Sequence, residues 1–112
     1  MIMQIATKPL KRVEVITVSG RVDSSTAPEF ERVLKDTLEA GRHQIVLDLE
    51  KVDYMSSAGL RALVAALKTA RRHNGDVRLA NPSNRVSEVL QLAGLTSLFE
   101  VYPSQVEAVG SF

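Results

Sequence analysis

The sequence predicts an α/β fold, in which a mixed, mostly parallel β-sheet of about five strands has about four helices packed against it. Short apolar stretches typical of strands alternate along the chain with longer stretches whose apolar residues recur at helical spacing. Strands that alternate with helices usually run parallel and are joined by right-handed crossovers. Two strand-like stretches come first, however, with only a short loop between them, which predicts an antiparallel hairpin at the start of the chain. The sheet is therefore expected to be mixed.

Five stretches are expected to form strands: residues 3–7, 13–19, 44–49, 76–80 and 98–102. In the first two, apolar residues alternate with polar or β-branched ones, as in strands with one buried face. The segment KPLKR is expected to be the hairpin loop, and Gly20 to close the second strand. The third stretch is almost continuously apolar, which is typical of a central strand, and a loop from Lys51 to Ser57 is expected to follow it.

Four helices are expected: residues 27–40, 57–74 and 81–94, and a short tail helix after Ser104. Thr26 precedes Glu29 by three residues, which is the spacing of a capping box and predicts the start of the first helix. Ser104 and Glu107 repeat this spacing before the tail helix. In the second helix the apolar residues recur every three or four positions, which predicts that Leu63 and its neighbours on that face lie in the core.

The composition is that of an ordinary globular protein, expected to form a single domain over residues 1–112. The 14 basic and 13 acidic residues give a formal charge of +1, which predicts no broad surface for nucleic acid or an anionic membrane. No apolar run approaches the length of a membrane span, so no membrane insertion is expected. The absence of cysteine excludes disulfides and thiolate sites, and His43 and His73 lack metal-ligand spacing, so neither a metal nor a cofactor is expected. The first residues lack the long apolar core of a signal peptide, so a cytoplasmic location is expected.

Polar side chains follow two of the expected strands, in the loops Arg21–Thr26 and Lys51–Ser57. Because the carboxyl ends of parallel strands meet at one edge of a sheet, these two loops are expected to be neighbours. The polar residues brought together would be Asp23, Ser24, Ser25, Thr26, Ser56 and Ser57. Such a cluster could bind a phosphate or carry a modification, or its first four members could simply cap the first helix. We favour capping for Thr26 and a functional role for Asp23.

The serine pair at the start of the second expected helix is the strongest candidate site. Backbone N–H groups lack partners there and the helix dipole favours negative charge, so a serine at this turn either caps the helix or carries a phosphate. One serine would suffice for capping, whereas Ser56 and Ser57 are both present. Ala58 and Gly59 follow with little side chain, which would let a partner approach the backbone closely.

A catalytic function is not predicted. The segment around the serines lacks the flanking glycines of a nucleophile elbow, and the chain contains no glycine-rich phosphate loop followed by lysine. Paired carboxylates at a plausible site are also missing. A small enzyme or nucleotide-binding protein that uses the serine turn remains the rival interpretation from another class.

Three segments resemble the anti-anti-sigma factors, which are STAS domains: VSGRVDSSTAPEF, IVLDLEKVDYMSSAGL and the pair Gly94-Leu95. The resemblance covers essentially the whole chain and implies a STAS-like fold, with helices packed largely on one side of a mixed sheet. In that family a serine or threonine at the start of the helix is phosphorylated by an anti-sigma factor that is also a kinase. The matching residue is Ser57. Many members have Asp immediately before it, and Ser56 stands there instead, which makes Ser56 the second candidate acceptor.

The resemblance also implies a partner and a switch. The unphosphorylated protein would bind an anti-sigma factor with serine kinase activity and so free the sigma factor, and phosphorylation would end the interaction. The expected partner surface consists of Asp23, Ser24, Ser25, Thr26, Ser56, Ser57, Ala58, Gly59 and Arg61. The alternative within this fold is a STAS subunit of a stress-signalling or lipid-transport complex. A weak homodimer is compatible with either interpretation.

Overall fold

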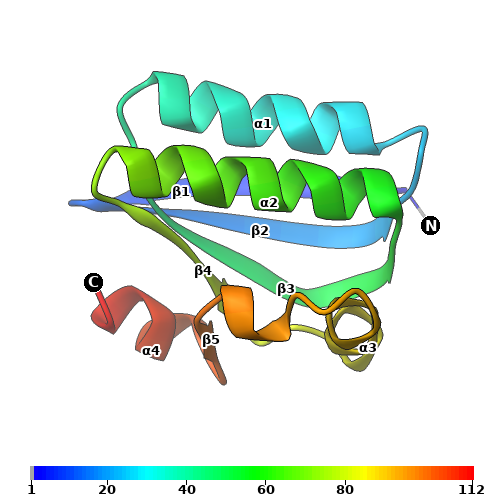
Figure 1. Ribbon diagram of the computed structural model, residues 1–112. Helices are drawn as coiled ribbons and strands as arrows, with labels where there is room; N and C mark the ends of the chain where they lie inside the picture. Colours follow the sequence, from blue (N-terminus) through cyan, green and yellow to red (C-terminus); the bar gives the residue numbers. More distant parts are fainter. Residues whose placement is uncertain (1) are drawn as a thin grey trace.

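The computed structural model describes residues 2–112 and confirms the α/β fold with a mixed five-stranded sheet (Figure 1). The strands are β1 (Gln4–Leu10), β2 (Val13–Val22), β3 (Gln44–Met55), β4 (Asp76–Ala80) and β5 (Val101–Tyr102), and they lie side by side in that order. The hairpin β1–β2 is antiparallel and every other neighbouring pair is parallel. Both halves of the prediction, an opening hairpin and parallel strands after it, are therefore confirmed.

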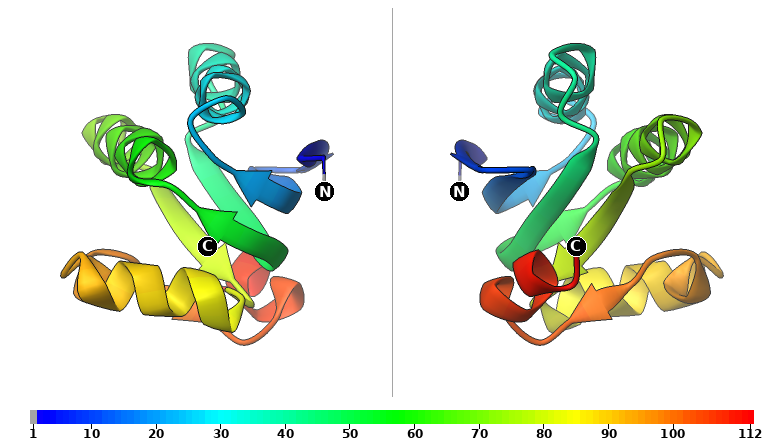
Figure 2. Two further views of the ribbon diagram at one scale, coloured as in Figure 1. Left: turned by 90° about the vertical axis from the view of Figure 1, so that its right-hand side faces the viewer. Right: turned by 90° about the vertical axis from the view of Figure 1, so that its left-hand side faces the viewer.

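Three helices cover one face of the sheet and a fourth covers part of the other (Figure 2). The first three are α1 (Ala27–Glu39), α2 (Ser57–Arg72) and α3 (Asn84–Leu92), and the fourth is α4 (Gln105–Gly110). Alternation along the strands produces this division, because successive side chains point to opposite faces. On β3, for example, Ile45 and Leu47 join the large core beneath α1 and α2, whereas Val46 joins the small core beneath α4.

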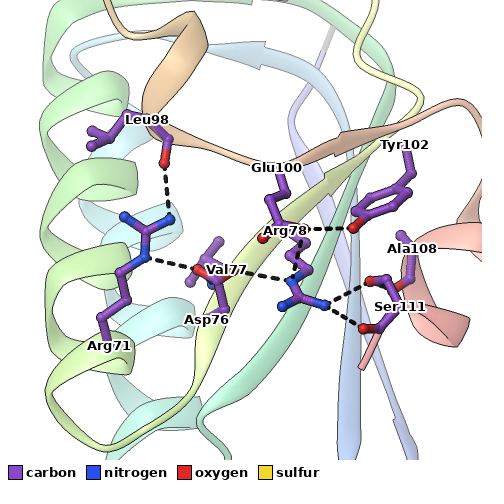
Figure 3. Close-up of polar contacts among 9 residues, drawn as sticks. All are labelled: Arg71, Asp76, Val77, Arg78, Leu98, Glu100, Tyr102, Ala108 and Ser111. Carbon is purple, nitrogen blue, oxygen red and sulfur yellow. Dashed lines mark hydrogen bonds and ion pairs between the residues drawn. The ribbon is translucent and has the colours of Figure 1, made fainter.

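The short helix α4 is held in place by an ion-pair network at the end of the chain (Figure 3). Asp76, which is only 7% exposed, accepts hydrogen bonds from Arg71 at 3.1 Å and from Arg78 at 3.0 Å. Arg78 also donates to the backbone oxygen and the hydroxyl of Ser111, at 2.6 and 2.8 Å, and its guanidinium stacks over the ring of Phe112. A helix of six residues is marginal alone, so these tertiary contacts stabilise it.

Several strand boundaries differ from the expectation. β1 extends to Leu10, so the hairpin turn is shorter than KPLKR. β2 continues through Gly20 to Val22, and the expected loop after residue 50 is strand as far as Met55. The two extensions support each other, because Val22 pairs with Met55 after register shifts around Ser19 and Gly20. Such irregularities insert extra residues and break the simple alternation on which the prediction depended.

The expected strand at 98–102 is mostly wrong. Thr96–Leu98 form a turn of 3₁₀ helix, and only Val101 and Tyr102 pair with β4. Apolar residues in this stretch are explained by packing instead, since Phe99 is buried in the large core. Within residues 2–112, no helix is long and apolar enough to cross a membrane.

Candidate functional site

The two polar loops meet at the edge of the sheet where β2 and β3 end. Val22 and Met55 are paired across the strands, and the backbone N–H of Ser56 donates to the carbonyl of Val22 at 2.7 Å. Both helices that follow these strands start at this edge, on the right-hand side of Figure 1. The predicted proximity of the loop at 21–26 to the serine pair is therefore confirmed.

The two serines have different roles at the start of α2. Ser56 is the N-cap: its backbone is extended, and its hydroxyl accepts a hydrogen bond from the N–H of Gly59 at 3.2 Å. Ser57 is the first helical residue, is exposed, and has a hydroxyl that forms no hydrogen bond with any other group among residues 2–112. One serine thus suffices for capping, as expected, and the other hydroxyl is free.

Gly59 has an internal packing role. A Cβ atom at this position would lie 2.8 Å from Cγ1 of Val22 and 2.5 Å from the sulfur of Met55. The absence of a side chain therefore lets the first turn of α2 pack directly against the ends of β2 and β3. Gly59 is buried, so it is not the exposed contact that the sequence suggested, whereas Ala58 remains partly exposed.

The loop before α1 is organised by Asp23. One of its carboxylate oxygens, Oδ1, accepts hydrogen bonds from the hydroxyl of Ser25 at 2.7 Å, from the N–H of Ser25 at 3.0 Å and from the N–H of Thr26 at 3.1 Å. The hydroxyl of Thr26 donates to the carbonyl of Arg21 at 2.8 Å and accepts from the N–H of Asp23 at 2.9 Å. The loop is thus closed by its own side chains, and Ser24 is exposed on it.

The expected capping box at Thr26 and Glu29 is wrong. Thr26 stands at the N-cap position but makes no side-chain capping bond. Its backbone is helical, with φ −101° and ψ −19°, whereas a capping residue is normally extended so that its oxygen can turn back to the helix. The tail helix follows the expectation better, because the hydroxyl of Ser104 accepts from the N–H of Glu107 at 3.1 Å.

The hydrogen bonds on Asp23 lower its pKa to about 2, with the Ser25 hydroxyl as the largest cause and the Thr26 backbone N–H next. A lowered pKa in the folded state means that ionised Asp23 stabilises the fold above the unfolded pKa of about 4. That contribution is lost as the pH falls from about 4 through 2.

We expect a carboxyl-detected NMR titration to give Asp23 a pKa near 2, and Ser25→Ala to raise it. The matched control is Ser24→Ala, which removes a neighbouring exposed hydroxyl that does not bond to Asp23. If the pKa of Asp23 is unchanged in Ser25→Ala, the Ser25 hydroxyl does not stabilise the ionised Asp23 carboxylate.

Ser57 lies at one end of a groove of about 510 Å³ on the surface of the domain. The residues that line it are Ser57, Leu60, Arg61, Val64, Ala65 and Lys68 from α2, with Ala93 and Leu95 from the chain after α3. Sequence reasoning named Ser57 and Arg61 but missed the rest as a surface. The helical spacing of the α2 residues can be read from the sequence. The position of Ala93 and Leu95 beside α2 cannot, because it depends on tertiary packing around the turn at Gly94.

Comparisons with known proteins agree with this geometry. Residues 4–108 match the model of the STAS domain family. The chain belongs to the STAS domain family. Two curated relatives of this STAS domain are 31% identical to it. BtrV of Bordetella bronchiseptica, named as a candidate anti-sigma factor antagonist, aligns over 98% of this chain and 95% of its own. The anti-sigma-B factor antagonist of Staphylococcus aureus aligns over 88% of this chain and 92% of its own.

Solved structures share the fold. The anti-sigma factor antagonist SpoIIAA in its unphosphorylated form has a TM-score of 0.81 at 20% identity, covering 95% of this STAS domain and 93% of its own chain. The phosphorylated form of SpoIIAA from Bacillus has a TM-score of 0.78, also at 20% identity, covering 96% and 98%. Both likenesses concern the fold: the element order and the layers of helices described above.

Proposed function

We propose that this protein is an anti-sigma factor antagonist whose binding is switched off by phosphorylation of Ser57. The observation that carries the proposal is the free, exposed hydroxyl of Ser57 at the first position of α2, next to the Asp23 loop. Its family membership and the names of its curated relatives support the same function. The protein would be a binding module in the cytoplasm, and the anti-sigma factor, acting as a serine kinase, would supply ATP and Mg²⁺.

The geometry favours Ser57 over Ser56 as the acceptor. In phosphoryl transfer, the Ser57 Oγ would form the new P–O bond, lose its proton and displace ADP from the γ-phosphate of ATP. Modification of that hydroxyl breaks no hydrogen bond among residues 2–112. Modification of Ser56 would instead disturb the cap on Gly59. A phosphate on Ser57 adds about −1.5 to −2 charges near a helix N-terminus, where negative charge is favoured.

The partner surface is proposed to combine the Asp23 loop with the exposed start of α2. Its members are Asp23, Ser24, Ser25, Thr26, Ser56, Ser57, Ala58 and Arg61. Because phosphate at this turn is compatible with the fold, its effect would be on the partner, through repulsion, bulk and altered hydration. Leu63 is buried and contributes to the core rather than to this surface, whereas Leu60 is mostly buried in the same core but also lines the groove.

Ser57→Asp is expected to lower the affinity for the anti-sigma factor at least tenfold, which corresponds to about 1.4 kcal/mol of binding free energy. The free energy of unfolding should change by less than about 1 kcal/mol, because the added charge stands at a favourable helix terminus. Calorimetric titration with the kinase-like anti-sigma factor of the host measures the first quantity, and urea unfolding the second.

Ser57→Ala is the matched control: it should bind like the unmodified protein and accept no phosphate from the kinase. If neither the native chain nor Ser57→Ala binds such an anti-sigma factor, the proposed function is wrong. If Ser57→Asp unfolds the domain, Ser57 is structural and the switch lies elsewhere.

A further inference from the structure

Arg61 lies one helical turn after Ser57 and lines the same groove. Residues four apart on a helix are surface neighbours, with Cβ atoms about 5–6 Å apart. Such a pair is more favourable when the acidic group stands at the earlier position and the basic group at the later one. This order also agrees with the helix dipole. A phosphate on Ser57 and the guanidinium of Arg61 would stand in this order.

Arg61 is free to accept such a partner, whereas Arg21 on the neighbouring loop and two arginines at the C-terminal end of α2 are already engaged. On the same helix, Arg71 is paired with Asp76, and Arg72 donates to the hydroxyl of Thr69 at 3.1 Å. On the neighbouring loop, Arg21 lies 3.8 Å from the Asp23 carboxylate and stacks over the ring of Tyr54. Within residues 2–112, no carboxylate forms an ion pair with Arg61, and its side chain is exposed.

We propose that Arg61 binds the phosphoryl group on Ser57, an inference that rests on the proposed function because it concerns the modified state of the same site. The guanidinium fork donates two parallel hydrogen bonds to phosphate oxygens, and charge-assisted bonds of this kind are stronger than neutral ones. Arg61 is therefore a phosphate-binding residue of the switch. Phosphorylation would order its side chain along the first turn of α2.

This pairing also changes the charge of the groove. In the unmodified protein the groove has apolar walls and two cations, Arg61 near Ser57 and Lys68 at the far end. This surface is complementary to a partner segment with an apolar side chain next to a carboxylate. A paired phosphate neutralises Arg61 and leaves excess negative charge beside it, so the same carboxylate is then repelled. Arg61 would thus contribute to binding in one state and to its loss in the other.

The test uses the full chain with phosphoserine incorporated at position 57 during translation, so that no kinase or anti-sigma factor is needed. Phosphorus NMR titration measures the second pKa of the phosphate, which is about 6 when unperturbed. A neighbouring cation favours the doubly charged form and lowers this pKa. We expect Arg61→Gln to raise it by about 0.15 to 0.4 unit relative to the native sequence at physiological salt, and about 1 M salt to abolish the difference.

Lys68→Gln is the matched control, because it removes the other cation of the same groove. Lys68 lies eleven residues along α2 from Ser57, about 16 Å of helix rise, which exceeds the Debye length of about 8 Å at physiological salt. This variant should leave the phosphate pKa unchanged. An equal shift in both variants, or none in Arg61→Gln, overturns the pairing. Because the titration involves no partner, that result leaves the proposed function standing, and a failure to bind an anti-sigma factor leaves the pairing standing.

Discussion

Replacing Leu63 with alanine is expected to lower the free energy of unfolding by about 2–5 kcal/mol. The side chain of Leu63 is 0% exposed and belongs to the large core between the helices and the sheet. Truncation removes buried apolar surface and leaves a cavity, because the surrounding strands and helices relax only partially. This is one of the two largest effects that we expect from a single substitution in the chain.

Urea unfolding monitored by circular dichroism measures this loss as a lower midpoint at an unchanged slope. The control is Lys68→Ala on the exposed side of the same helix, which should change stability by less than about 0.5 kcal/mol. The protein that stays folded should keep its affinity for the anti-sigma factor, because Leu63 does not reach the partner surface. A loss below about 1 kcal/mol would mean that α2 is not closely packed at Leu63.

Gly20→Ala is expected to have a comparable effect, about 2–5 kcal/mol, for a different reason. The backbone of Gly20 has φ +91°, a conformation that costs other residues about 1–3 kcal/mol. A Cβ atom there would also lie only 2.5 Å from the carbonyl oxygen of Ile2, where the start of the chain passes β2. Because a backbone atom cannot rotate away, relieving the clash must shift a strand, which costs about 1–3 kcal/mol more.

Gly41→Ala separates the two causes. Gly41 follows α1 with φ +88°, nearly the same φ as Gly20, but an added Cβ would meet no atom within 4 Å. It should therefore lose only the conformational part, about 1–3 kcal/mol. Chemical denaturation measures the loss of unfolding free energy in each variant, and the difference between the two losses is the cost of the clash at Gly20. Equal losses of unfolding free energy in the two variants would show that the close approach of the Ile2 carbonyl to Gly20 adds no cost.

Much of the fold follows from local patterns in the sequence. Helical spacing of Leu60, Leu63 and Leu67 predicted the buried side of α2, and all three are in the core. Alternating apolar residues predicted the opening hairpin, which exists with longer strands. The serine pair was also informative: one residue caps the helix and the other is exposed, as expected if a single cap suffices. These features depend on neighbours within about one helical turn or a few strand residues.

Tertiary contacts decided the details of the site. The strands extend to Val22 and Met55 because each extension pairs with the other, which no local window contains. Asp23 organises its loop, and Thr26 does not cap α1, because the hydroxyl of Thr26 bonds to the backbone of its own loop instead. Gly59 is buried because the ends of both strands pack against it.

The groove beside Ser57 was decided in the same way. Its α2 side is a stripe of residues at helical spacing, of which only Ser57 and Arg61 were predicted to belong to a surface. The opposite side is formed by Ala93 and Leu95, which lie about thirty residues further along the chain and are placed beside α2 by the packing of α3 on the sheet. The sequence by itself thus determined the helix, its cap and the exposed hydroxyl, because these follow from local backbone hydrogen bonds and apolar periodicity. The surface around that hydroxyl was determined by the tertiary structure, because packing of distant segments chooses which side chains face it.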